Sequence, residues 1–106
     1  MSQKPTARED TAAYVVTPRT PWRVREVCAL PDYQLHVTFI DGSAGIVDMS
    51  GLINSDHAGV FAALRDEDRF REVFVHCGAV TWPGELDLAP DAMHRQIQQS
   101  GTWILN

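Results

Sequence analysis

The most constraining feature of the sequence is a run of alternating apolar and polar residues that ends in a turn signal. In residues 33–39 the apolar side chains occupy every second position. A period of two, with β-branched and aromatic residues, predicts a half-buried strand. Asp41 and Gly42 follow, and glycine accepts the positive φ of a type I′ turn. The sequence therefore predicts a hairpin in which residues 44–49 form the returning strand.

The rest of the chain is expected to add three strands and two short helices. These elements are a strand over residues 22–30, a helix around Val60, Phe61 and Leu64 capped by Ser55 or Asp56, strands over residues 70–77 and 79–82, and a helix from Pro90 to Gly101. Proline suits the first turn of a helix and glycine its end. The expected fold is a single two-layer α+β domain. Its antiparallel sheet, of order β-β-β-α-β-β-α, is covered by the helices.

Length and charge limit what the chain can be. With 106 residues it has a single-domain length, divided into a flexible N-terminal tail over residues 1–20 and a domain over residues 21–106. The formal net charge is −5. Phosphate binding depends on lysine and arginine, so no direct binding of nucleic acid is expected. The basic residues Arg19, Arg23 and Arg25 are interpreted as a solvated face.

The compartment is predicted from what the chain lacks. No apolar stretch approaches the roughly 20 residues of a membrane helix, and the polar N-terminus has no apolar run of a signal peptide. We therefore expect a cytoplasmic protein without membrane contact. Its two cysteines, Cys28 and Cys77, are expected to be reduced, small core residues.

No motif for catalysis, metal or cofactor binding is found in the sequence. The four histidines and two cysteines form no C-x-x-C or H-x-x-x-H pair, which would bring two ligands onto one metal ion. No nucleophile elbow or paired-acid signature is present either. We therefore expect no enzyme activity, no metal and no cofactor.

Two apolar groups are candidates for an interaction surface. Trp82 precedes Pro83 at the end of a predicted strand, where it either anchors the core or contacts a partner; its apolar neighbours favour the core. The C-terminal residues Trp103, Ile104 and Leu105 follow the last predicted helix. An apolar cluster outside a periodic element is typical of a contact surface.

Three ordered groups of residues carry a family resemblance. They are Val27 with residues 30–35, 37–39, 41–42, 47–49 and Leu52; Phe61 with residues 64–66, Phe70, Val73 and Val75; and residues 80–83 with 86–88 and 90–92. From about Trp22 to Met93 the chain resembles the bacterial family called domain of unknown function 2442. The resemblance implies a small α+β domain without established catalytic residues.

The resemblance also implies a biological setting. Some relatives carry a helix-turn-helix domain after this one, and many are encoded beside a second small protein in an arrangement similar to a toxin–antitoxin pair. Because this chain ends at Asn106, no helix-turn-helix is expected in it.

The leading hypothesis is a non-enzymatic protein-interaction module, antitoxin-like or regulatory, in a two-protein bacterial system. Its partner is expected to be another small, toxin-like protein or a second copy of the chain. An acidic surface would speed association with a basic partner. The alternative is a regulatory domain that senses a small ligand, which requires a concave apolar pocket with a few polar groups.

Overall fold

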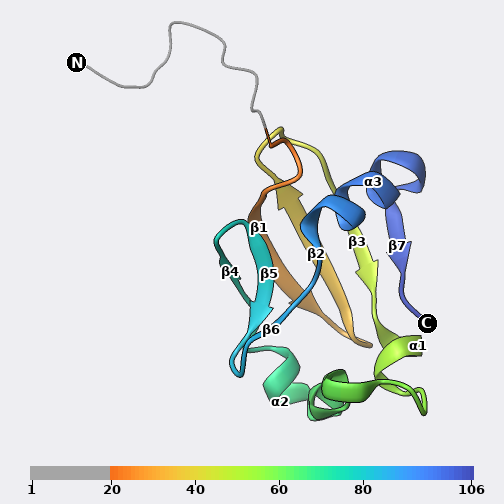
Figure 1. Ribbon diagram of the computed structural model, residues 1–106. Helices are drawn as coiled ribbons and strands as arrows, with labels where there is room; N and C mark the ends of the chain where they lie inside the picture. Colours follow the sequence, from red (N-terminus) through yellow and green to blue (C-terminus); the bar gives the residue numbers. More distant parts are fainter. Residues whose placement is uncertain (1–19) are drawn as a thin grey trace, which may run out of the picture.

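The computed structural model describes residues 20–106 (Figure 1). The predicted tail, residues 1–20, lies outside the described residues except for Thr20. The elements are, in chain order, β1 (Val24–Leu30), β2 (Gln34–Phe39), β3 (Ala44–Asp48), α1 (Ser50–Ile53), the 3-10 helix η1 (Gly59–Arg65), α2 (Glu67–Phe70), β4 (Phe74–His76), β5 (Ala79–Trp82), β6 (Leu86–Asp87), α3 (Pro90–Ser100) and β7 (Thr102–Ile104).

The predicted α+β class is confirmed, but the sheet arrangement differs from the prediction. Strands β1, β2 and β3 form the expected antiparallel meander, and β7 adds to β3 in parallel. Strands β4, β5 and β6 form a second, antiparallel sheet. The single antiparallel sheet and the order β-β-β-α-β-β-α are therefore wrong. The chain rises from β6 to α3 at the upper end of the larger sheet, so β7 starts at the same end as β3 (Figure 1).

The hairpin between β2 and β3 is confirmed, but its turn is of another type. The Gly42 N–H donates to the Phe39 carbonyl (3.0 Å), and the Phe39 N–H donates to the Ser43 carbonyl (2.8 Å). Gly42 has φ +91°, whereas Asp41 has no positive φ. This pattern is a three-residue loop with a glycine bulge, since a type I′ turn needs positive φ at both central residues. That requirement is met between β4 and β5, where Cys77 and Gly78 have φ values of 52° and 76°.

One face of the larger sheet carries the core. Leu35, Val37 and Phe39, the apolar positions of the alternating run, are all 0% exposed. From the other layer, Trp82 of β5 and the α3 residues Met93 and Ile97 join the same buried cluster. On the opposite face of the sheet, β1 and β2 expose residues such as Cys28 and His36. The domain therefore has two layers, with one sheet face left in contact with solvent.

The middle of the chain is more helical than the sequence suggests. Around Val60 the chain forms a 3-10 helix whose N-cap is Ala58, so the predicted caps Ser55 and Asp56 are wrong. The strand expected over residues 70–77 is limited to Phe74–His76 because Phe70 ends α2. The Asp66 carboxylate caps α2 by accepting a hydrogen bond from the Asp68 N–H (3.0 Å).

Helix α3 agrees with its predicted boundaries. Pro90 occupies the first turn, and Gly101 ends the helix with φ +79°, where its N–H donates to the Ile97 carbonyl (2.7 Å). Because Gly101 turns the chain sharply, the residues after it can return along β3. The predicted helix therefore also determines where the C-terminal apolar residues lie.

Asp41 joins the β2–β3 hairpin to α3. Its carboxylate accepts hydrogen bonds from the Ser43 N–H (2.9 Å) and hydroxyl (2.6 Å), and from the His94 Nε2 (2.9 Å). The His94 ring also meets the Phe39 ring edge to face at 4.8 Å. Burial raises the pKa of Asp41, but the hydrogen bonds from Ser43 and His94 outweigh it and hold the pKa at about 2.

Asp41→Asn is expected to lower the free energy of unfolding at pH 7 by about 1–2 kcal/mol. The folded pKa of Asp41 is depressed, so its contribution is present above the unfolded value near 4 and is lost as the pH falls toward 2. Urea denaturation of both proteins at several pH values measures the difference. Exposed Asp56 supplies the control, Asp56→Asn. A difference that stays constant between pH 7 and pH 2 would contradict the assignment.

Candidate functional site

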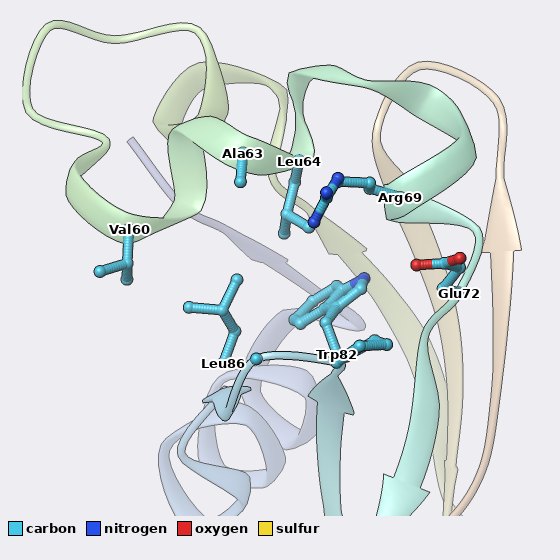
Figure 2. Close-up of a pocket in the computed structure, with 9 residues that line it drawn as sticks. Val60, Ala63, Leu64, Arg69, Glu72, Trp82 and Leu86 are labelled. Carbon is cyan, nitrogen blue, oxygen red and sulfur yellow. The ribbon is translucent and has the colours of Figure 1, made fainter.

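A pocket of about 290 Å³ opens above Trp82, between η1, α2 and the turn that joins β5 to β6 (Figure 2). We call it the Trp82 pocket. Its lining residues are Val60, Ala63, Leu64, Arg69, Glu72, Trp82, Pro83, Gly84 and Leu86. Seven of these nine residues are apolar or glycine, and the remaining two are oppositely charged. The pocket is therefore an apolar depression with a cation and an anion on its rim.

Trp82 forms the floor of this pocket and is held rigidly. Its side chain is 1% exposed, and its indole N–H donates to the Phe70 carbonyl (2.9 Å). The ring centroids of Phe61 and Phe70 lie 6.4 Å and 6.0 Å from the ring centroid of Trp82. A buried indole that keeps its hydrogen bond is a stable platform. The structure thus places Trp82 in the core, as its apolar neighbours indicate, and away from the C-terminal residues.

Arg69, in the last turn of α2, and Glu72, two residues after the end of that helix, stand on the rim of the pocket. Figure 2 shows the Arg69 guanidinium above the Trp82 ring and the Glu72 carboxylate directed toward the same opening. Both residues are exposed. Within residues 20–106, neither takes part in an ion pair of 4.0 Å or less, whereas nearby Arg71 pairs with Glu67 and Asp68. Their charges are thus available to a ligand that carries both signs.

The C-terminal residues form β7 and divide into two groups. Trp103 and Leu105 are half-buried against the core, whereas Ile104 is 62% exposed. The Ile46 N–H donates to the Gly101 carbonyl (3.1 Å) and the Leu105 N–H to the Asp48 carbonyl (2.9 Å). Trp103 and Leu105 therefore fold back onto the domain, and Ile104 is the exposed member of the predicted apolar cluster.

The hydrogen bonds between β3 and β7 also define which peptide groups of β7 face solvent. Trp103 bonds to β3 as the partner of Val47, so the peptide groups of Thr102 and Ile104 point to the other side. The Thr102 carbonyl accepts a hydrogen bond from the Ser100 hydroxyl (2.8 Å). We call the outward peptide groups of Thr102 and Ile104, with the Ile104 side chain, the β7 edge. This edge is the outer strand of the four-stranded sheet.

The cysteines are not core residues, contrary to the prediction. Cys28 and Cys77 are both exposed: Cys28 lies on the solvent side of β1 opposite His36, and Cys77 lies in the β4–β5 turn. Cys77 has φ +52° in the tight turn beyond the end of β4, where its side chain is exposed to solvent. No group of three or more metal-ligating side chains occurs in residues 20–106.

Sequence reasoning missed the rim of the Trp82 pocket. Arg69 and Glu72 lie in the charged run from Arg65 to Glu72, where each resembles any other surface charge. What distinguishes them is that η1 and the β5–β6 turn approach the same side of α2. The sequence does not separate Arg69 from Arg71, because Arg69 also has acidic residues at helical spacing, Asp66 three positions before it and Glu72 three positions after it.

In residues 20–106 the longest helices are too short and too polar to cross a membrane.

A family model described as "Protein of unknown function (DUF2442)" matches residues 24–99. No curated protein and no solved structure matches the chain. The matched region runs from the first residue of β1 almost to the end of α3, which is well over half of the chain. The chain therefore belongs to the DUF2442 family, as its resemblance predicted.

Proposed function

We propose that the domain is a non-enzymatic protein-interaction module that binds its partner by strand addition at the β7 edge. The observation that carries the proposal is the outward peptide of Ile104, a residue that is 62% exposed. An open sheet edge supplies main-chain hydrogen bonds to an incoming strand, and the neighbouring side chain supplies an apolar contact. Binding of this kind needs no reacting group.

The partner that we propose is a small basic protein. With a formal net charge of −5, the chain attracts a basic partner and accelerates its encounter. Family resemblance suggests the source: a toxin-like protein encoded beside the gene, for which this domain is the antitoxin-like or regulatory member. A second copy of the chain is the competing occupant, since two β7 edges can pair with each other.

Ile104→Pro is expected to abolish partner binding while leaving the fold in place. Proline removes the outward N–H of Ile104 and its apolar contact. The bonds from Trp103 and Leu105 to β3 remain. The measurement is capture of partners from the native host with tagged full-length protein, quantified by mass spectrometry. We expect one small basic protein with the wild type and at least about tenfold less with the variant.

Val60→Asp is the matched control, because Val60 is 66% exposed and lies on η1, outside the four-stranded sheet that contains β7. It should recover the partner as well as the wild type does. Equal recovery with Ile104→Pro would refute strand addition at this edge. Light scattering measures the molar mass of the purified wild type and so distinguishes the two proposed partners. A dimer that Ile104→Pro converts to a monomer would identify a second copy of the chain as the partner.

The second candidate function, sensing of a small ligand, is supported by a different observation. The Trp82 pocket is concave, mostly apolar and carries two charges, which are the features of a small-molecule site. This function does not exclude the first, since the β7 edge and the Trp82 pocket are formed by different elements.

A further inference from the structure

We infer that the Trp82 pocket binds a free α-amino acid with an apolar side chain, with the ligand carboxylate on Arg69 and the ligand ammonium near Glu72. The inference concerns a site separate from the β7 edge, so it stands or falls independently of strand addition. It follows from three properties of the pocket: its size, its apolar floor, and the two charges on one side of its rim.

The size of the pocket limits the ligand to a small molecule. A volume of about 290 Å³ lies at the lower end of the roughly 300–1,000 Å³ typical of ligand sites. A nucleotide needs more room and several groups that bind its phosphates, whereas the lining of this pocket has one cationic residue, Arg69. A single amino acid is small enough to fit entirely inside a pocket of this size.

The floor and walls favour an apolar side chain. Trp82 and Leu64 are buried below, and the apolar surface that a ligand would cover belongs to Val60, Ala63, Pro83 and Leu86. Val60, which is 66% exposed, stands at the mouth of the pocket, so a ligand would cover it. Removing apolar surface from water gives about 25 cal/mol per Å² on both partners. A leucine-like or phenylalanine-like side chain therefore gains more here than a polar one.

The charges on the rim select a zwitterion. Arg69 presents a planar guanidinium that suits a carboxylate, and Glu72 presents an acceptor for an ammonium group. Among residues 20–106, Arg69 and Glu72 do not form an ion pair of 4.0 Å or less with each other, so both charges can serve a ligand that carries adjacent opposite charges. An anion alone would be attracted by Arg69 and repelled by Glu72. A simple fatty acid or a simple amine is therefore a poorer ligand than an amino acid.

The test is titration of the full chain with L-leucine and its blocked relatives, followed by ¹H–¹⁵N correlation spectra. The chain has three indole N–H groups, in Trp22, Trp82 and Trp103. We expect saturable shifts of the Trp82 indole signal with a Kd of about 1 mM or below, and no shift of the Trp103 signal. N-acetyl-leucine, leucinamide and glycine, which lack the ammonium, the carboxylate and the side chain, should each bind at least about tenfold more weakly.

Two rim variants and two controls locate the site. Arg69→Gln and Glu72→Gln should each weaken leucine binding by about tenfold or more. Arg71→Gln and Glu67→Gln, which change an exposed ion pair on the same helix, should leave binding unchanged. All four positions are exposed, so the variants should fold.

The inference is overturned if leucine and phenylalanine cause no saturable shift of the Trp82 signal up to about 10 mM. If leucine and N-acetyl-leucine bind equally well, Glu72 does not recognise the ammonium group. If leucine and leucinamide bind equally well, Arg69 does not recognise the carboxylate. Neither result would bear on capture of a protein partner at the β7 edge.

Discussion

Trp82→Ala is expected to lower the free energy of unfolding by about 3–5 kcal/mol, a large part of the stability of a domain of this size. The side chain is 1% exposed and contacts the rings of Phe61 and Phe70. Alanine leaves a cavity between η1, α2 and the smaller sheet. It also removes the donor that serves the Phe70 carbonyl, which ends α2. Loss of this one side chain therefore loosens three elements at once.

Urea denaturation monitored by circular dichroism measures this loss, and Trp82→Phe separates its two parts. Phenylalanine keeps most of the apolar volume but cannot donate to Phe70, so its cost should be smaller, about 1–3 kcal/mol. A loss below about 1.5 kcal/mol for Trp82→Ala would show that the side chain is not packed as described.

Gly45→Ala is expected to destabilise the fold by about 1–3 kcal/mol although it adds only one carbon. A Cβ atom on Gly45 would lie 2.6 Å from Ile97 Cγ2 and 2.7 Å from the Gly101 carbonyl oxygen. That carbonyl is backbone and accepts a hydrogen bond from the Ile46 N–H (3.1 Å). To make room, α3 and the start of β7 must move away from β3 together.

The same denaturation assay measures this cost, with Ala44→Thr as the control on the neighbouring, exposed position of β3. The control should change stability by less than about 0.5 kcal/mol. Gly45→Ala should also accelerate hydrogen exchange of the Trp103 amide, because the helix that positions β7 has shifted. Unchanged stability would mean that α3 does not pack directly on β3.

Local patterns explain why part of the fold was predictable. The alternation over residues 33–39 specifies a strand and its buried face at once, so Leu35, Val37 and Phe39 lie in the core as expected. Helix α3 is bounded by Pro90 and Gly101, residues whose backbone preferences act within one turn. These signals need no information from distant parts of the chain.

The missed features depend on contacts between distant residues. The parallel pairing of β7 with β3 joins residues more than 50 positions apart, and nothing within Thr102–Ile104 specifies the direction of the strand. Cys77 is exposed because it lies in the turn between β4 and β5, whereas the sequence analysis places it in the strand over residues 70–77 and expects it in the core. Of the predicted interaction residues, only Ile104 is exposed, because alternation along β7 turns Trp103 and Leu105 inward.

Hydrogen exchange at β7, with and without the captured partner, tests the proposed interaction most directly. In the free chain the Trp103 and Leu105 amides should exchange slowly because they bond to β3, while the Ile104 amide should exchange quickly. On binding, the Ile104 amide should become protected by at least about tenfold as the incoming strand accepts its hydrogen bond. An Ile104 amide that still exchanges quickly in the saturated complex would contradict strand addition at the β7 edge.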